Sequence, residues 1–576
     1  MCDKLVFDLS TEIEGSPNIF VKKDWLNILD NQNGNYSANQ SVVDTSQLSN
    51  SNKFLSYKEA LLSIPMLITV TSAQNDTFLP AATASSADYC IGLKNWFGTV
   101  IHSFTLDYNG TTVIQQTPFI NMWNSFKLMT TLSWSDVSTI GSTIGFYPDD
   151  PLSFGWDNAP SSSGVGVTNN TNFSPLALQN IVTGEFNAYK SRNGNLGFLN
   201  RQRYINFDQD GEPGTTVGQT YANLLTNAAA TQLWKSRIST KISAAAGVSG
   251  VYQISVRATV YLKHIHSFFQ RIPLLKGVYM KMTLNLNNSS TTFSVSGAGI
   301  VTLTGSSVPV GGVQPLMVAS RRANNGGFGF GAGTYTASLS VGERCLNSAQ
   351  VGIPGVATGV NGGNIFLYVP AYTFNGPFLE SYLSNPVKNI EYTDVYQYQI
   401  LNVGATNGVI NSLLTNGLAN VKSVLLLPYF TEIVPGSATA AEKLPPYQSP
   451  FDPAGSGCTS PLVLLNNFNV VVSGQNAIYN TIRYSADLFN QQVYGCNAVN
   501  GGLTDGLTSS LIDSLGWEME YCYHYVNVER MLPIEQSVPK SIQVIGQNQS
   551  SKPINLICFV EYALTVSINL LSGARV

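Results

Sequence analysis

Most of this sequence consists of short β-strand patterns separated by clusters of Gly, Asn, Pro and Ser. In Ser255–Lys263, apolar and polar residues alternate with the period of two that a half-buried strand requires. Helices do not alternate regularly with these runs, so the pattern predicts an antiparallel sandwich and not a βαβ protein. The predicted strands are Ile68–Thr71, Phe97–Asp107, Thr111–Gln116, Tyr252–Lys263, Val278–Asn285, Asn364–Pro370, Val421–Leu427, Phe468–Ser473, Trp517–Val526, Ser541–Ile545 and Ile554–Asn569.

The length of 576 residues predicts two to four domains, because a single core of this size is unusual. A weak internal repeat favours two similar β-barrels in tandem. Y-L-K-H-I-H-S-F-F-Q-R-I-P contains Arg271, and Y-C-Y-H-Y-V-N-V-E-R-M-L-P contains Arg530. The two arginines are 259 residues apart (530 − 271), close to half the chain.

The Gly-rich segment Arg321–Gly333 predicts a linker between the two domains. The predicted division is an arm over 1–52, a first domain over 53–320, a linker over 321–334 and a second domain over 335–576. A long insertion is predicted at 147–241 in the first domain, with a helix over Tyr221–Trp234. Two more short helices are predicted, one capped by Ser485 and ending before Gly495, the other carrying Leu503, Leu507, Leu511 and Leu515.

The segment before the first predicted strand is rich in Asn, Gln, Ser and Asp and has a turn signal at Asn33-Gly34. It is too polar to bury a helix face, so we predict an arm, from Asp24 to Gln47, that lies on neighbouring protein and folds on assembly. The predicted assembly residues are Trp25, Asp30, Asn31, Gln32, Asn33, Tyr36 and Asp44.

Charged residues form only 11% of the chain and the net charge is −4. Uncharged polar residues take their place, which favours a surface that contacts other protein. No basic stripe is present, so we expect no direct sequence-specific nucleic-acid partner. The seven cysteines have no C-x-x-C spacing and predict buried thiols. The first residues contain no long apolar run, and nowhere do eighteen apolar residues follow one another, so we expect no signal peptide and no transmembrane segment.

Residues that could carry chemistry are few, and we predict no catalytic, cofactor or metal site. His264 and His266 would share one strand face, yet no third zinc ligand lies near them. Glu518 and Glu520, beside Trp517, form the most catalytic-looking carboxylate pair, on one strand face. Asp149-Asp150 is a further carboxylate cluster, and Asp208–Glu212 resembles a calcium loop but lacks its remaining ligands.

Tyrosines and phenylalanines, 27 of each, are the stronger candidates for function. Tyr521–Tyr525 and Tyr392–Tyr398 place aromatic side chains on one face at strand spacing. Such rows fill a barrel core or anchor an interface, and the sequence leaves both roles open.

Five sequence elements give the chain a resemblance to the major capsid proteins of virophages and polinton-like viruses. The first is D-N-Q-N-G-N-Y from Asp30, followed by V-D-T-S-Q-L and A-L-L-S-I-P. The others are S-P-F at Ser449–Phe451, S-A-D-L-F-N-Q-Q at Ser485–Gln492, V-N-V-E-R at Val526–Arg530 and I-N-L-L-S-G at Ile568–Gly573.

This resemblance implies an all-β fold of two tandem eight-stranded jelly-roll barrels, with short helices in loops. It also implies a homotrimer of nearly hexagonal outline that tiles an icosahedral virion shell, assembled inside the host cell. The insertion at 147–241 would form an outward tower, and penton and minor capsid proteins would be partners. The alternative is a tandem β-sandwich that binds carbohydrate or hydrolyses glycosides, with Glu518 and Glu520 as its carboxylate pair.

Overall fold

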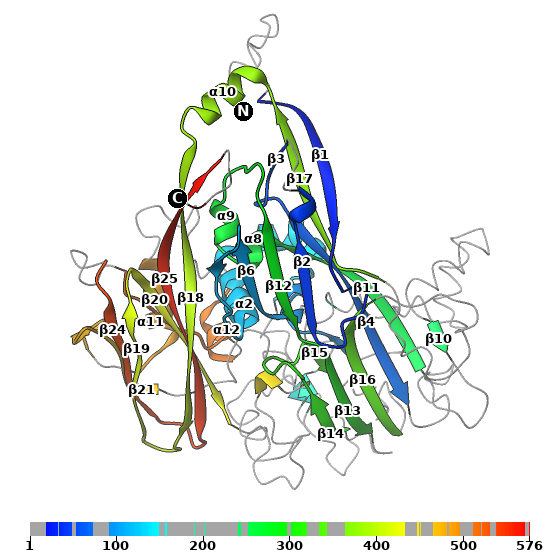
Figure 1. The fold of residues 1–576 in the computed structure, drawn as a ribbon. Helices are drawn as coiled ribbons and strands as arrows, with labels where there is room; N and C mark the ends of the chain where they lie inside the picture. The colour runs from blue at the N-terminus through cyan, green and yellow to red at the C-terminus, as the bar shows by residue number, and fades with distance from the viewer. Residues whose placement is uncertain are drawn as a thin grey trace, which may run out of the picture.

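The computed structural model consists mainly of antiparallel strands in two sandwiches that lie side by side, the second on the left of Figure 1. It describes residues 19–32, 34–48, 53–72, 91–148, 156–157, 189–190, 201, 240–242, 251–295, 301–318, 333–342, 363–431, 446–448, 450, 463, 465–480, 483–495, 511–519, 521–529, 537–570 and 575.

The second sandwich is built from eight strands in two sheets, with the orders β18-β25-β20-β23 and β19-β24-β21-β22. Numbered along the chain, the first sheet holds strands one, eight, three and six, and the other holds two, seven, four and five. The strands are β18 (Val387–Val403), β19 (Gly408–Leu418), β20 (Val421–Phe430), β21 (Leu465–Val472), β22 (Gln475–Asn476), β23 (His524–Asn527), β24 (Lys540–Asn548) and β25 (Ile554–Asn569).

The first sandwich has the same strand order. One sheet runs β1-β17-β4-β11 and the other runs β2-β12-β6-β7, again strands one, eight, three, six and two, seven, four, five. The strands are β1 (Phe20–Leu29), β2 (Gln40–Asp44), β4 (Leu61–Ser72), β6 (Ile101–Tyr108), β7 (Thr111–Ile114), β11 (Val251–Tyr261), β12 (Met280–Leu286) and β17 (Phe366–Phe374).

This strand order, with the first and last strands adjacent in one sheet, is that of a jelly roll. The chain therefore contains two jelly rolls in tandem, as the resemblance implied, and the predicted fold class is confirmed. Further strands extend the first sandwich between its seventh and eighth strands, where β16 continues along β4 and pairs with β13. The strands inserted there are β13 (Ser289–Val295), β14 (Val301–Ser307), β15 (Leu316–Val318) and β16 (Gly333–Val341). Short strands earlier in the chain are β3 (Phe54–Leu55), β5 (Ile91–Leu93), β8 (Trp156–Asp157), β9 (Tyr189–Lys190) and β10 (Thr240–Ile242).

Alternating side chains place the core between the sheets. In β12 and in β24, every second residue is buried and the others are half-buried, as a sheet with one face on the core requires. Apolar residues of both sandwiches form one continuous buried cluster.

Helices occupy matching places in the two sandwiches. In each sandwich two helices follow the fifth strand, α2 and α3 after β7, and α11 and α12 after β22. Ser133 and Asp136 form a capping box at the start of α3, which satisfies free backbone N–H groups. The helices are α2 (Ile120–Thr131), α3 (Trp134–Ile144), α8 (Leu262–Ile265), α9 (Phe268–Arg271), α10 (Gly376–Leu383), α11 (Ala486–Gly495) and α12 (Ser514–Met519).

The predicted arm is wrong for its described residues. β1 pairs with β17 along its length and β2 pairs with β12, so both are strands of the first sandwich. Polar side chains in this segment and the turn that follows it have partners within the chain. Ser41 Oγ donates to Asp30 Oδ2 at 3.1 Å, for example, and the Ile365 N–H donates to the Tyr36 hydroxyl at 2.8 Å.

The predicted domain boundary also differs from the observed one. β16 and β17 follow the Gly-rich segment yet belong to the first sandwich, so the chain passes to the second sandwich between Phe374 and Val387, through α10. In chain order, the Gly-rich segment falls between the seventh and the eighth strand of the first sandwich, not between the two sandwiches. Residues 321–332, nearly all of 147–241 with its predicted helix, and Leu503 and Leu507 lie outside the described residues.

The weak repeat was correct in its conclusion and wrong in its alignment. The first segment spans α8 and α9, whereas the second contains β23, and Arg530 lies outside the described residues. The last predicted strand, Ile554–Asn569, is confirmed as β25. The predicted strand Trp517–Val526 is wrong in its first half, because Trp517 lies in α12 and the strand begins at His524.

Candidate functional site

α2 fills the seam between the two sandwiches, and its sequence explains this position. Ten of its 12 residues are buried, which fits a helix that is covered on all sides. The Trp123 ring lies 5.8 Å from Phe559 of β25, and the Phe126 ring stacks at 5.6 Å on Tyr525 of β23. Such ring pairs contribute about 0.5–1.5 kcal/mol each beyond the area they bury. Thus a helix of the first sandwich is anchored in the second.

β23 shows which face of the second sandwich α2 covers. His524 turns inward, where its ring lies 5.9 Å from Phe468 on the opposite sheet. The next residue, Tyr525, turns to the other side and contacts Phe126. α2 therefore covers the outer face of the sheet β18-β25-β20-β23, the face that points away from that sandwich's own core.

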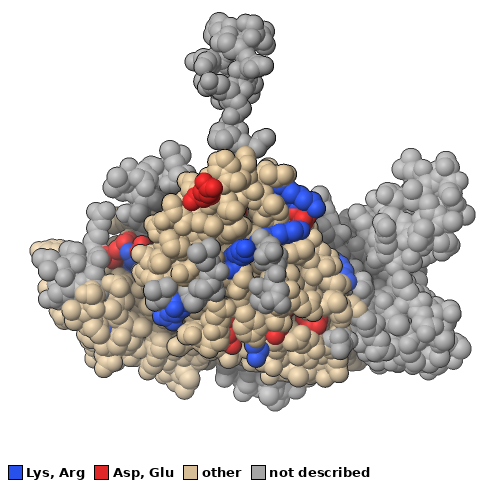
Figure 2. Space-filling view, turned by 45° about the horizontal axis from the view of Figure 1, so that its top comes forward, with Lys and Arg blue, Asp and Glu red and all other residues tan. Residues whose placement is uncertain are grey.

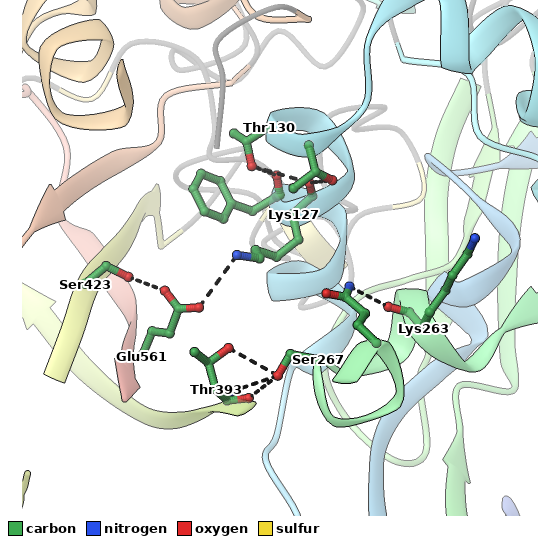
Figure 3. Close-up of polar contacts among 10 residues, drawn as sticks. Lys127, Thr130, Lys263, Ser267, Thr393, Ser423 and Glu561 are labelled. Carbon is green, nitrogen blue, oxygen red and sulfur yellow. Dashed lines mark hydrogen bonds and ion pairs between the residues drawn. The ribbon is translucent and has the colours of Figure 1, made fainter. Parts of the chain in front are cut away.

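Polar contacts fix the two sandwiches in register (Figure 3). Lys127 Nζ of α2 lies 3.6 Å from Glu561 Oε1 of β25, and Ser423 Oγ donates to Glu561 Oε2 at 2.8 Å. Ser267 Oγ donates to the Thr393 carbonyl at 2.6 Å and accepts from the Thr393 N–H at 2.9 Å. Because these groups are largely shielded from water, their contacts stabilise one relative orientation of the two sandwiches.

Two further polar contacts cross the same seam from β18. The Tyr392 hydroxyl donates to the Val113 carbonyl at 3.0 Å, and burial raises the pKa of Tyr392 to about 12. His266 Nδ1 accepts from the Phe268 N–H at 3.2 Å, so His266 Nε2 carries the proton and lies 3.4 Å from Asp394 Oδ1. These contacts position backbone and side chains across the seam.

Of the residues weighed as candidates for chemistry, the structure describes His264, His266 and Glu518. His264 lies in α8 and His266 caps its end, so the prediction that they share a strand face is wrong. Glu518 is exposed on α12, not on a strand, and Glu520 lies outside the described residues, as do Asp149-Asp150 and Asp208–Glu212. Across the described part of the chain, no group of three or more His, Cys, Asp or Glu could hold a metal ion.

Two of the seven predicted assembly residues lie inside the first sandwich. Asp30 and Tyr36 are buried, 3% and 4% exposed, and burial raises the pKa of both groups. Asp44 ends β2 and accepts from the Ser46 N–H at 2.7 Å. Asn31 and Gln32 form the turn after β1, and Asn33 lies outside the described residues. Only Trp25, 52% exposed, presents a large apolar surface to solvent.

Trp25 belongs to a surface that sequence reasoning missed, the outer face of the sheet β1-β17-β4-β11. The register places Trp25 beside Pro370 and Leu29 beside Phe366, opposite the side of Ile28, which enters the core. We call this surface the outer β1 face and define it by Trp25, Leu29, Arg257, Phe366 and Tyr368. The alternation of β1 was its only sequence signal, and polar neighbours masked that signal.

Charge is sparse on the surface seen in Figure 2, where charged side chains form small, separated groups on an otherwise uncharged face. The sequence predicted such a surface from its 11% of charged residues. No helix in the described ranges is both long and apolar enough to cross a membrane.

The fold and the seam define a double jelly-roll protein whose two sandwiches share a core. No family model and no curated protein matches the chain. Solved structures that resemble it include viral capsid proteins. The Sputnik virophage structure has a TM-score of 0.49 and 9% identity, covering 99% of this chain and 91% of that one. The mavirus major capsid protein has 0.45 and 9%, covering 98% and 92%. The Faustovirus major capsid protein has 0.41 and 9%, covering 97% and 92%.

Proposed function

We propose that this chain is a major capsid protein, the building block of an icosahedral virion shell. The tandem arrangement supports this proposal most directly, since two sandwiches of one topology lie side by side in one chain. Three such chains around a threefold axis present six similar sandwiches, and the resulting hexagonal outline tiles a surface. The role is structural, and we assign no catalytic step to the chain.

The surface composition fits repeated contact with protein. Uncharged polar groups lose less on desolvation than charges do, and only 11% of residues are charged. Partners are further copies of the chain, together with penton and minor capsid proteins at positions where the symmetry changes. With a net charge of −4, the chain itself does not neutralise a genome. The protein resides in the virion and assembles inside the host cell.

The molar mass in solution tests the proposal. We expect light scattering on the purified chain to give about 186 kDa, three times 62.1 kDa. Electron micrographs of the same sample should show particles of hexagonal outline or closed shells. A chain that stays a monodisperse monomer at assembly-relevant concentrations contradicts the proposal.

A further inference from the structure

The start of α2 has a backbone conformation that costs energy. Phe119, the residue before the helix, has φ of +59° and ψ of +25°, in the left-handed region that strains a bulky residue. Its side chain accepts no capping hydrogen bond, so the helix cap does not offset this strain. The Phe119 carbonyl accepts from the Met122 N–H at 2.9 Å, which ties this conformation to the first turn of α2. Packing from elsewhere in the fold therefore has to hold Phe119 in place.

The first sandwich packs against the Phe119 ring through His102 of β6. The two ring centres lie 5.3 Å apart in an edge-to-face arrangement. Gly312 lies close to both rings, since a Cβ added there would come within 2.6 Å of His102 Cδ2 and 3.4 Å of Phe119 Cδ1. His102 and Gly312 thus leave the Phe119 ring little room to move toward the first sandwich.

The second sandwich reaches the same ring through Tyr447, which lies in the connection between β20 and β21. The centre of the Tyr447 ring lies 6.0 Å from that of Phe119 and 4.6 Å from that of Tyr429 in β20, edge-to-face in both pairs. Tyr447 is buried, and the Tyr429 hydroxyl donates to the Tyr447 hydroxyl at 3.3 Å. Tyr447 therefore links a strand of the second sandwich to the residue that precedes α2.

A backbone hydrogen bond fixes Tyr447 on the first sandwich. The Gln314 N–H donates to the Tyr447 carbonyl at 2.8 Å. Gln314 is fully buried, and its Nε2 donates to Thr291 Oγ1 of β13 at 3.1 Å and to Ser306 Oγ of β14 at 3.0 Å. Because its side chain is held by two strands, Gln314 offers its N–H from a fixed position. The Tyr447 ring is positioned accordingly.

We propose that Tyr447 is the positioning residue of the seam: it packs on Phe119, holds the strained start of α2 and so sets how this helix lies between the two sandwiches. A second contact acts at the same turn, where Thr117 Oγ1 donates to the Val395 carbonyl of β18 at 3.0 Å. The second sandwich thus holds the turn before α2 at two points. Because all these contacts lie within one chain, the role of Tyr447 does not depend on the proposed trimer.

Hydrogen exchange on the full chain, followed by mass spectrometry, tests this role. In the natural chain the Gln314 amide should exchange as slowly as the amides of β24, although Gln314 lies outside the strands. Tyr447→Ala should speed exchange at Gln314 and in the first turn of α2 by about tenfold or more, with β24 unchanged. Tyr447→Phe loses only the hydroxyl, so its exchange should match that of the natural chain.

Tyr372→Ala is the matched control. Tyr372 is 8% exposed, as is Tyr447, and it packs on Phe20 within the first sandwich. This substitution should lower stability and leave Gln314 and the first turn of α2 protected.

The double variant Tyr447→Ala/Phe119→Gly tests whether Tyr447 acts through Phe119. Glycine adopts positive φ without strain, so once residue 119 is glycine the loss of Tyr447 should add little to exchange in the first turn of α2. Three results overturn the inference: rapid exchange of the Gln314 amide in the natural chain, a protected α2 in Tyr447→Ala, or effects of the two substitutions that multiply independently.

Discussion

His102 and His524 lie in the interior, where they are 6% and 0% exposed. Burial lowers the pKa of His102 to about 4 and that of His524 to about 3, so both rings are neutral in the folded protein. In the unfolded chain they take up protons near pH 6.5. The unfolded state therefore binds more protons below that pH, and folding stability declines as the pH falls.

We predict a loss of about 1.4 kcal/mol in unfolding free energy per pH unit for each of these histidines, below about pH 6.5. Urea unfolding at about pH 7 and about pH 5.5 measures this loss, above the range in which most carboxylates titrate. His524→Gln should reduce the slope of stability against pH, whatever its effect on absolute stability. An unfolding free energy that is constant over this range contradicts the prediction.

Single residues also show why composition could not separate the buried from the exposed members of the predicted assembly set. The sequence shows that Asp30 and Tyr36 are polar, but the partner of the Tyr36 hydroxyl is the backbone of Ile365, 329 positions away. A polar segment satisfied by such distant groups has the same composition as an exposed arm. Trp25 was selected for the arm yet lies on a sheet face, where an assembly role is still our proposal.

Hairpin turns are the elements that best mark the true repeat. Asn109-Gly110 joins β6 to β7 and Ser473-Gly474 joins β21 to β22, and all four residues have positive φ. Two residues of positive φ match the twist of a tight hairpin. The turns are 364 residues apart (473 − 109), whereas the arginine pair suggested 259 (530 − 271). The long insertions of the first sandwich cause this difference.

Gly110→Ala should cost about 1 kcal/mol of stability, because its φ of +81° strains any residue with a Cβ. No atom lies within 4 Å of the added Cβ, so the loss comes from the backbone alone. Gly417→Ala is the matched control, since its Cβ also meets open space but its φ is not positive. Thermal unfolding of the two variants compares them, and equal melting temperatures refute the backbone argument.

Strand prediction was correct for a long segment rich in β-branched residues and partly wrong for a segment rich in aromatic residues. Ile554–Asn569 is long and β-branched, and β25 has the same bounds. Trp517–Val526 is rich in aromatic residues, yet α12 occupies its start, where Trp517 Nε1 donates to the Tyr523 carbonyl at 2.9 Å. Tertiary contacts of this kind override local propensity.

At the scale of the whole molecule, the shared core couples the two sandwiches. Phe126 is fully buried and contacts Tyr523 and Tyr525 across the seam at 4.9 and 5.6 Å. The presence of two similar sandwiches could be predicted from the sequence. The seam could not, because α2 was not recognised among the β patterns and its partners lie some 400 residues further on, as with Tyr525 (525 − 126 = 399).

We predict that the natural chain unfolds in one calorimetric transition and that Phe126→Ala, which removes about 3–5 kcal/mol of packing, separates it into two. Phe489→Ala is the control, because this equally buried ring packs on Trp517 and Tyr523 within the second sandwich. It should lower stability without separating the sandwiches. Two transitions in the natural chain would falsify the coupling.

The pairing of the first strand with the eighth has a consequence during protein synthesis. Phe20 pairs with Phe374, so the ribosome must add 354 residues (374 − 20) after Phe20 before its partner is made. At about 5–20 residues per second this takes roughly 18–71 s. For that time the nascent β1 has no partner strand, and its apolar side chains are open to chaperones and to other nascent copies on the same messenger.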